Sequence, residues 1–147
     1  MPNLSEPVHK TLLGFDFGMK HIGVAVGQTI TQTASPVTTL QARDGIPNWT
    51  ELQALIDRWK PSELVVGVPF NMDGSSQLMT FCARRFIKRL TAKFNLPIHE
   101  VDERLTSWEA KTRNEFKLKK SKTKRKDQED HATAAVIIVE QWMADQK

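Results

Sequence analysis

Residues 12–27 read LLGFDFGMKHIGVAVG, and this stretch predicts two strands joined by a tight turn. Because side chains alternate across a strand, Asp16 shares a face with Leu12 and Gly14. A carboxylate beside apolar residues is costly to bury unless a positive or hydrogen-bonding group meets it. Asp16 is therefore either a site residue or an aspartate that ends a strand and bonds to its own turn. The rest of the chain has to supply its partners.

Composition predicts an ordinary globular protein. The chain has 147 residues, of which 39% are hydrophobic and 26% charged, so we expect one domain (11–147) behind a loose N-terminal tail (1–10). Its single cysteine, Cys82, excludes a disulfide within the chain, which fits a reducing compartment. No basic leader precedes an apolar run, and no run reaches the length of a membrane span, so we expect a cytoplasmic protein.

The positive charge is concentrated in one segment. Residues 111–126 hold nine basic residues and one acid, Glu115, whereas the whole chain carries a net charge of +4. This excess of positive charge indicates that the segment binds a polyanion, rather than being a solvated loop without a binding role. The residues that we expect to contact nucleic-acid phosphates here are Lys119, Lys120, Lys122, Lys124 and Arg125.

The order of the elements predicts an α/β fold. Three strand-like segments with short connections favour an antiparallel meander, and Pro36 in the third indicates an edge or a bulge. Two buried-type strands then alternate with helical patterns, so we expect a mixed five-stranded sheet, an antiparallel meander plus parallel strands, with helices on both faces. The predicted strands are 12–17, 22–27, 33–40, 63–68 and 98–102, and the helices lie at 49–59, 78–94, after Thr106, and around 132–143.

Two helices carry further local signals. Asn48 can cap the helix at 49–59, and Pro61 marks its end. The helix at 78–94 has an apolar residue at every fourth position and a basic outer face. The apolar stripe is Leu78, Cys82, Phe86, Leu90 and Phe94, and the basic residues are Arg84, Arg85, Lys88 and Arg89.

Carboxylates follow the predicted parallel strands. The carboxyl ends of such strands meet at one edge of the sheet, where ligands gather. Hard oxygen ligands without a histidine or cysteine cluster favour Mg²⁺ or Mn²⁺, and carboxylates around such ions are typical of sites that hydrolyse phosphodiesters. The candidates are Asp16, Asp73, Asp102, Glu103, Asp127 and Asp130, with Arg104 beside them to steady phosphate charge.

Most of these acids also have a structural explanation. Asp127 and Asp130 can cap the last helix, and Asp73 precedes Gly74 in a common turn pair. Asp102 and Glu103 point to opposite faces if both are still in a strand, so we expect only one of them to face the site. The sequence alone leaves open which one it is.

Four segments resemble the YqgF family of the RNase H-like superfamily. They read GFDFGMKHIGVAVG (14–27), LVVGVPFNMDG (64–74), VDERLTSWEA (101–110) and DHATAAVII (130–138), in family order. The family is described as Holliday junction resolvases and as nucleases that mature the 5′ end of precursor 16S rRNA. The resemblance implies an RNase H-like fold and a metal-binding acidic triad of Asp16, Glu103 and Asp130, with Asp102 and Asp127 as alternates.

The resemblance also sets the expected function, a Mg²⁺- or Mn²⁺-dependent endonuclease acting on structured nucleic acid. Precursor 16S rRNA is the favoured substrate, and ribosomal particles are among the expected partners. The alternatives are a Holliday junction resolvase in DNA recombination and repair, or a non-catalytic RNA-binding factor associated with the ribosome. Two departures weaken the match. Met19 stands where the family usually has threonine, and the lysine-rich segment stands where relatives often have glycine.

Overall fold

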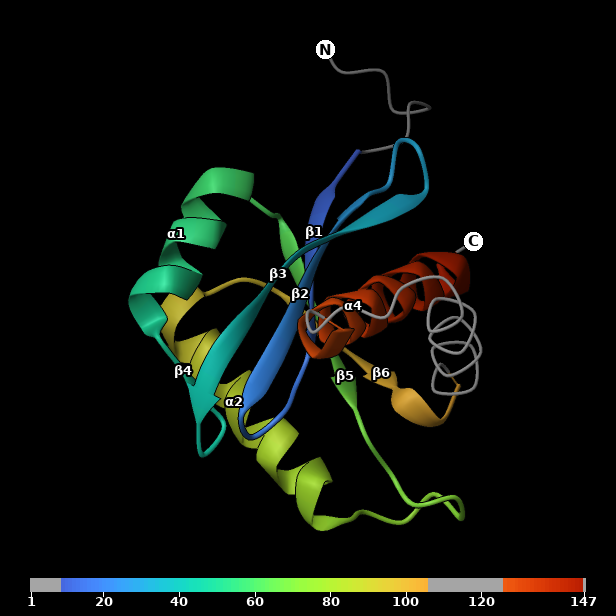
Figure 1. Ribbon diagram of the computed structural model, residues 1–147. Helices are drawn as coiled ribbons and strands as arrows, with labels where there is room; N and C mark the ends of the chain where they lie inside the picture. Colours follow the sequence, from blue (N-terminus) through green and yellow to red (C-terminus); the bar gives the residue numbers. More distant parts are fainter. Residues whose placement is uncertain (1–8, 106–125, 147) are drawn as a thin grey trace.

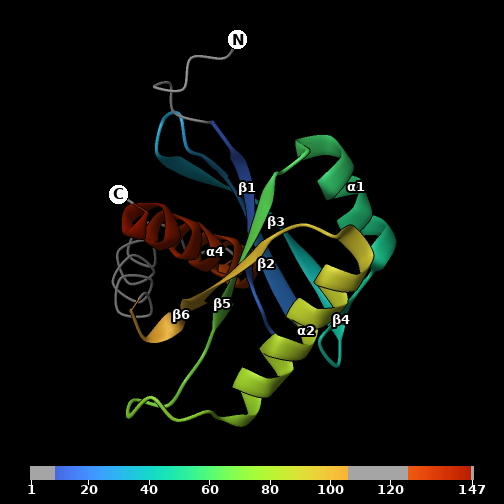
Figure 2. The ribbon, with the colours of Figure 1, turned by 180° about the vertical axis from the view of Figure 1, so that it is seen from behind.

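The computed structural model describes residues 9–105 and 126–146, with side chains for 9–104 and 131–146. In this part of the chain, six strands form one sheet that has helices on both faces (Figures 1 and 2). The strands are β1 (Thr11–Asp16), β2 (His21–Gln28), β3 (Thr33–Arg43), β4 (Ile46–Pro47), β5 (Glu63–Val68) and β6 (Ile98–Asp102). The helices are α1 (Trp49–Trp59), α2 (Leu78–Phe94) and α4 (Lys126–Asp145), with a 3₁₀ turn at Glu103–Leu105.

The sheet confirms the predicted mixed topology. Its strand order is β4-β3-β2-β1-β5-β6; β1 to β4 form an antiparallel meander, whereas β5 and β6 run parallel to β1. The pairing of β2 with β3 shifts register between Val24 and Ala25, and Ala25 pairs with Pro36, which confirms the predicted irregularity. Parallel strands joined through helices place the ends of β1, β5 and β6 at one edge of the sheet.

The predicted count of five strands was one too low. β3 continues to Arg43, and Asp44 and Gly45 then turn the chain so that β4 pairs back onto it. Both turn residues have positive φ, 52° and 78°, which matches the backbone that a two-residue hairpin requires. The Asp-Gly pair was therefore a readable hairpin signal in the sequence.

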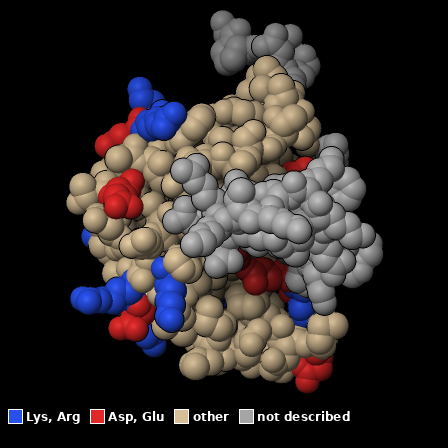
Figure 3. All heavy atoms as spheres, viewed as in Figure 1, with Lys and Arg blue, Asp and Glu red and all other residues tan. Residues whose placement is uncertain are grey.

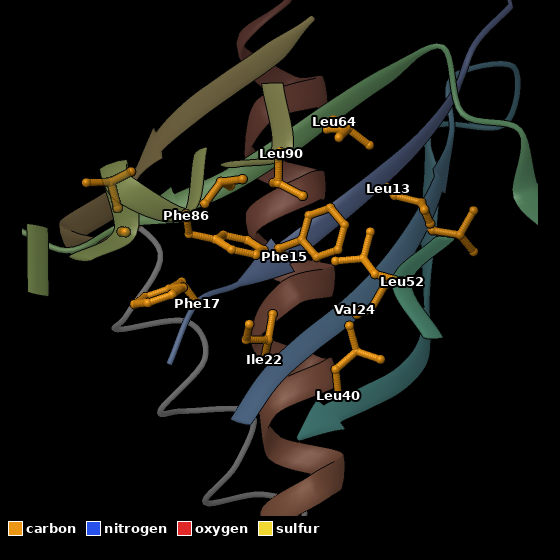
Figure 4. Close-up of a cluster of buried hydrophobic side chains, with 14 residues drawn as sticks. Leu13, Phe15, Phe17, Ile22, Val24, Leu40, Leu52, Leu64, Phe86 and Leu90 are labelled. Atoms are coloured by element: carbon orange, nitrogen blue, oxygen red, sulfur yellow. The ribbon is translucent and has the colours of Figure 1, made fainter. Parts of the chain in front are cut away.

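One face of the sheet packs against α1 and α2 in the main hydrophobic core (Figure 4). Phe86 of α2 lies at its centre, with its ring centroid 5.8 Å from that of Phe15 and 5.3 Å from that of Phe17. Leu13 and Phe15 of β1 are fully buried on this face, as the strand alternation predicts. The surrounding core residues include Ile22, Val24, Leu40, Leu52, Leu64 and Leu90.

The local signals of α1 are confirmed. The Asn48 side chain accepts hydrogen bonds from the backbone N–H groups of Thr50 and Glu51, which caps the helix start. The helix ends at Lys60, which adopts the left-handed conformation with φ 47°.

The apolar stripe predicted for α2 is wrong at its first residue. Leu78 is 79% exposed, whereas Phe86 and Leu90 are fully buried. A spacing of four residues advances 400° around a helix of 3.6 residues per turn, so a stripe with this spacing drifts away from the core. Thr80 and Ala83 occupy the buried side of the first turns instead.

The other face of the sheet lies against α4. The predicted apolar stripe of this helix is buried as expected. Gly23 of β2 allows the closest approach, because a Cβ atom at this position would lie 1.9 Å from the carbonyl oxygen of His131. The buried residues of the stripe are Ala132, Ala135, Val136, Val139 and Met143.

A ring contact also joins β6 to α4. The imidazole of His99 stacks on the indole of Trp142 with centroids 4.7 Å apart.

None of the described helices is long and apolar enough to cross a membrane. Residues 1–8 of the predicted N-terminal tail and the helix expected after Thr106 lie outside the described residues.

Candidate active site

Asp16 ends β1 on the face that α4 covers. Its neighbours in the sheet are Gly23 of β2 and Gly67 of β5, which pair with it on either side. Since paired residues point to the same face, the carboxylate of Asp16 has no side chain beside it on either adjacent strand. The two glycines leave space next to Asp16, and other segments of the chain fill it.

Glu103 enters this space from the end of β6. A Cβ atom added to Gly67 would lie 2.8 Å from Oε1 of Glu103, so the carboxyl group of Glu103 rests over this glycine. The Oε1 atom is buried. Burial first, and then the charge of Asp16 and a hydrogen bond with it, raise the pKa of Glu103 to about 9. Asp16 and Glu103 therefore converge, and the proton that Glu103 keeps at neutral pH is shared in its hydrogen bond with Asp16.

Asp102 makes a different contact, although it directly precedes Glu103. Its Oδ2 atom lies 2.6 Å from Nη2 of Arg104, and its Oδ1 atom accepts from the Arg104 backbone N–H at 2.9 Å. The hydrogen bonds from Arg104 hold the pKa of Asp102 below its usual value. Of the two adjacent acids, it is Glu103 that meets Asp16, and Asp102 orients an arginine.

Arg104 connects the end of β6 to the loop that follows β5. Its Nη1 atom donates to the carbonyl oxygen of Met72 at 3.3 Å, and its guanidinium lies over the ring of Phe70 at 5.8 Å. Arg104 is thus fixed at the rim of the site, with Asp102 as its ion-pair partner.

Asp73 has the turn role that its neighbour Gly74 indicated. Its Oδ1 atom accepts hydrogen bonds from the backbone N–H of Ser75 at 2.9 Å and from the Ser75 hydroxyl at 2.6 Å. These bonds from Ser75 lower the pKa of Asp73, which is exposed. In this arrangement Asp73 shapes the loop.

Two histidines border the carboxylates, and neither was a candidate from the sequence. Nδ1 of His131 lies 3.9 Å from Oδ2 of Asp16, and its ring stacks on that of His21 with centroids 5.1 Å apart. His21 and His131 are far apart in sequence and show no ligand spacing. The only available signal was the position of His131 directly after Asp130.

The remaining predicted site residues lie outside the part of the chain whose side chains are described. Asp127 and Asp130 belong to α4 by their backbone, and Asp130 directly precedes His131, whose carbonyl oxygen lies against Gly23. The predicted phosphate-binding residues are Lys119, Lys120, Lys122, Lys124 and Arg125, and all five fall in residues 106–125.

The carboxyl pair fits a divalent cation. Two carboxylates held together in a partly buried position repel each other, and a bound cation compensates this repulsion. Asp16 and Glu103 supply hard oxygen donors, as Mg²⁺ and Mn²⁺ prefer. Within the described side chains, no three His, Cys, Asp or Glu residues form a metal-binding group, so a further ligand has to come from elsewhere.

The face of the molecule seen in Figure 3 carries charged side chains of both signs. A group of acidic side chains lies below the middle of the molecule with a basic side chain beside it, and further acidic and basic side chains lie at the left. A polyanion bound beside acidic side chains needs positive charge from the protein or from bound cations.

The sequence is similar to proteins that are described as nucleases. The family model described as "RuvX: Holliday junction resolvase" matches residues 10–145. A Coxiella burnetii protein named "Putative pre-16S rRNA nuclease" is 50% identical over 135 residues, covering 92% of this chain and 93% of its own length. A Shewanella oneidensis protein of the same name is 53% identical over 133 residues, covering 90% and 93%.

Solved structures share the fold at low sequence identity. Thermus thermophilus RuvC bound to a Holliday junction superposes with a TM-score of 0.56 at 12% identity, covering 92% of this chain and 94% of RuvC. The yeast mitochondrial Holliday junction resolvase Ydc2 gives a TM-score of 0.52 at 12% identity, covering 90% and 77%. These likenesses confirm the predicted RNase H-like fold. By its sequence over nearly its whole length, the chain belongs to the RuvX (YqgF) family of resolvase-type nucleases.

Proposed function

We propose that this protein is a divalent-metal-dependent endonuclease that cuts structured nucleic acid, with precursor 16S rRNA as its substrate. The observation that carries the proposal is the convergence of Asp16 and Glu103 at the carboxyl edge of the sheet, where Glu103 has a pKa of about 9. A buried carboxyl group whose pKa is raised by burial and by a second acid is typical of active sites. Relatives about half identical in sequence and named as pre-16S rRNA nucleases support the choice of substrate.

In this proposal, Asp16, Glu103 and Asp130 hold Mg²⁺ or Mn²⁺, with Asp102 and Asp127 as alternates for the second and third acids. A cation held there would lower the pKa of a bound water and would stabilise negative charge on the leaving oxygen. Asp16 and Glu103 fix the donor oxygens on rigid backbone, because one ends a central strand and the other begins a 3₁₀ turn. Loss of the shared proton leaves both groups charged for binding.

The protein's own cations hold the substrate in place. Arg104, oriented by Asp102 at 2.6 Å, is positioned to bind a phosphate oxygen next to the scissile bond. Lys119, Lys120, Lys122, Lys124 and Arg125 contribute longer-range contacts to phosphates. The absence of disulfide chemistry fits action in the cytoplasm, where ribosomal particles carry the substrate.

A cleavage assay with Asp16→Asn as the control variant tests the activity. Precursor 16S rRNA fragments and a four-way DNA junction are offered separately with Mg²⁺, Mn²⁺ or EDTA. We expect metal-dependent cutting of the rRNA fragment by the parent and none by the variant. Cutting of the junction alone would support the resolvase alternative, which the RuvX description favours. Binding without any cutting would support the non-catalytic factor.

Melting curves test the metal site without relying on activity. In EDTA, Asp16→Asn removes the negative charge that helps to raise the pKa of Glu103, so we expect it to melt at the parent's temperature or higher. A metal that binds only the folded parent adds RT ln(1 + [L]/Kd), about 2.7 kcal/mol at a hundredfold excess over Kd. The parent should therefore gain stability with Mg²⁺ or Mn²⁺ and the variant little. Equal destabilisation of the variant in both conditions would make Asp16 a turn residue.

A further inference from the structure

An exposed apolar edge begins at Met72, whose carbonyl oxygen accepts a hydrogen bond from Arg104 of the candidate site. Among the described residues, six large hydrophobic side chains are exposed, and three of them fall within ten positions: Met72 is 90% exposed, Leu78 79% and Phe81 58%. Met72 belongs to the loop after β5, and Leu78 and Phe81 belong to the first turn of α2. Both ribbon views show this loop and the start of α2 hanging below the ends of β5 and β6 (Figures 1 and 2). We call Met72, Leu78 and Phe81 the apolar edge.

The loop that carries Met72 is held in a defined conformation. The backbone N–H of Asn71 donates to Ser75, and that of Gly74 donates to Asn71, each at 2.9 Å. The Met72 carbonyl oxygen accepts from Arg104, which neighbours Glu103. Large exposed hydrophobic side chains that gather on one loop and on the start of the helix after it are typical of an interaction site. Its contact with Arg104 ties the apolar edge to the candidate active site.

Positive charge continues the apolar edge along α2. This helix contains five basic residues and no acid. Arg85 and Lys88 follow Phe81 at helical spacings of four and seven, so the three residues share one outer face. Arg84 pairs with Glu100 at 3.1 Å, but neither Arg85 nor Lys88 pairs with an acid in the described part of the chain.

We propose that the apolar edge and the α2 face beside it bind an unpaired strand of the substrate next to the cleavage site. Unpaired bases stack on Phe81 and pack against Met72 and Leu78, while Arg85 and Lys88 bind the backbone phosphates of the same strand. Alternating apolar platforms and cations are the chemistry of single-strand binding, because every base has a stackable face and every linkage a charge. A protein partner would have to be acidic along α2. The proposal rests on the proposed nuclease function and specifies its substrate as a helix with a single-stranded arm.

Equilibrium binding in EDTA tests the proposal without cleavage. Three labelled probes are compared by fluorescence anisotropy: a blunt RNA duplex, the same duplex with a ten-nucleotide 3′ or 5′ arm, and the arm alone. We expect Phe81→Ala to weaken the armed duplex and the arm about tenfold or more, the loss typical of one stacked base, and to leave the blunt duplex unchanged. The same probes made of DNA distinguish an RNA from a DNA arm. Ile30→Ala, at a residue 61% exposed but distant in the fold, is the matched control.

Salt dependence tests the charges. Replacing Arg85 and Lys88 by glutamine should lower the slope of log affinity against log salt for the arm by about 1.4, since each phosphate contact to a single strand contributes about 0.7. Glutamine at Arg58 and Lys60, near the other end of the sheet, removes the same charge and should leave the slope unchanged.

Three results would overturn the proposal. Equal weakening of all probes by Phe81→Ala would show a general effect of folding or charge. Unchanged affinity for the arm would show that no base stacks there. Loss of a dimer on Phe81→Ala, measured by light scattering, would assign the apolar edge to a second copy of the chain. If the parent still cuts its substrate, any of these outcomes leaves the proposed function intact. A parent that binds neither the armed duplex nor the arm also overturns this proposal, whereas only failure of the cleavage assay with metal overturns the proposed function.

Discussion

The two faces of the central sheet differ most at neighbouring residues of β1. Phe15 points into a core of large side chains around Phe86, with ring centroids 5.8 Å apart. Asp16 points to the other face, where its lateral partners are Gly23 and Gly67. The first face fills its volume with side chains, which stabilises the fold. The second face has its own apolar contacts with α4, but it lacks side chains at Gly23 and Gly67, so that a helix backbone and a second carboxylate can approach. The candidate chemistry therefore lies where the packing of side chains on the sheet is interrupted.

The largest expected loss of unfolding free energy is on the filled face, by which we mean the face of the sheet that packs against α1 and α2 around Phe86. Phe86→Ala removes a fully buried ring, and such truncations cost about 3–5 kcal/mol of unfolding free energy. Phe81→Ala, on the same helix but 58% exposed, is the control and should change stability by less than about 0.5 kcal/mol. Urea unfolding followed by circular dichroism measures both. Similar losses for the two variants would contradict the assignment of the core to this face.

A smaller loss of unfolding free energy is expected on the other face, where α4 approaches the sheet at Gly23. Gly23→Ala places a methyl group where the His131 carbonyl oxygen lies 1.9 Å away, so α4 has to shift, at a cost of about 1–3 kcal/mol. Gly27→Ala clashes with the side chain of Val139 and makes ordinary contact with Met143 and Leu12. A side chain adjusts more easily than a backbone carbonyl group, so this substitution should cost less. Cleavage assays should show a greater loss for Gly23→Ala than its melting temperature alone explains. Equal effects of the two substitutions would mean that the close approach at Gly23 is unimportant.

The protonation of Glu103 gives a pH dependence that the filled face lacks. In the metal-free protein its pKa rises from an ordinary value of 4.5 to about 9, so between these values the folded state binds more protons than the unfolded state. Unfolding free energy therefore falls as pH rises through this window. We expect Glu103→Gln to flatten the dependence of melting temperature on pH between about 5 and 9 in EDTA.

Glu100→Gln provides the control for that experiment. Glu100 lies on β6 as an exposed partner of Arg84, away from Asp16. Its substitution should leave the pH dependence of the parent in place. A parent protein whose melting temperature rises steadily from pH 5 to pH 9 would contradict the shared proton.

The smallest expected effect on stability concerns Arg104, at the rim. Arg104→Lys keeps the charge but replaces a bidentate fork by a point charge, so phosphate binding weakens. Because the ion pair with Asp102 is exposed, we expect almost no change in melting temperature but a clear loss of kcat/KM. The two measurements are made on the same preparation. A fall in melting temperature with unchanged turnover would assign Arg104 to the fold instead.

The sequence predicted the filled face and the sheet well because both depend on local periodicity. Strand alternation placed Phe15 and Asp16 on opposite faces, and the Asn48 cap was readable from residue type alone. The spacing of four residues wrongly placed Leu78 of α2 in the core. An α-helix has 3.6 residues per turn, so residues spaced by four drift around its surface. The short β4 was missed although Asp44-Gly45 signalled it.

The candidate site was predictable only in part. Asp16 stood out as a carboxylate in an apolar strand, and the resemblance to a family selected Glu103. The alternation of strands could not decide between Asp102 and Glu103, since the chain leaves the strand between them and enters a 3₁₀ turn. His21 and His131 meet only through the packing of α4 on β2, and no spacing in the sequence encodes that contact.

The glycines under α4 also constrain how such a sequence can change over generations. A core like the one around Phe86 tolerates exchange of one apolar residue for another when a neighbour compensates in volume. A glycine that faces a carbonyl oxygen has no such compensating partner, because a backbone atom cannot be replaced. Drift in descendants of this chain should therefore accumulate among the α1 and α2 contacts, while Gly23 is retained for as long as α4 remains seated beside Asp16.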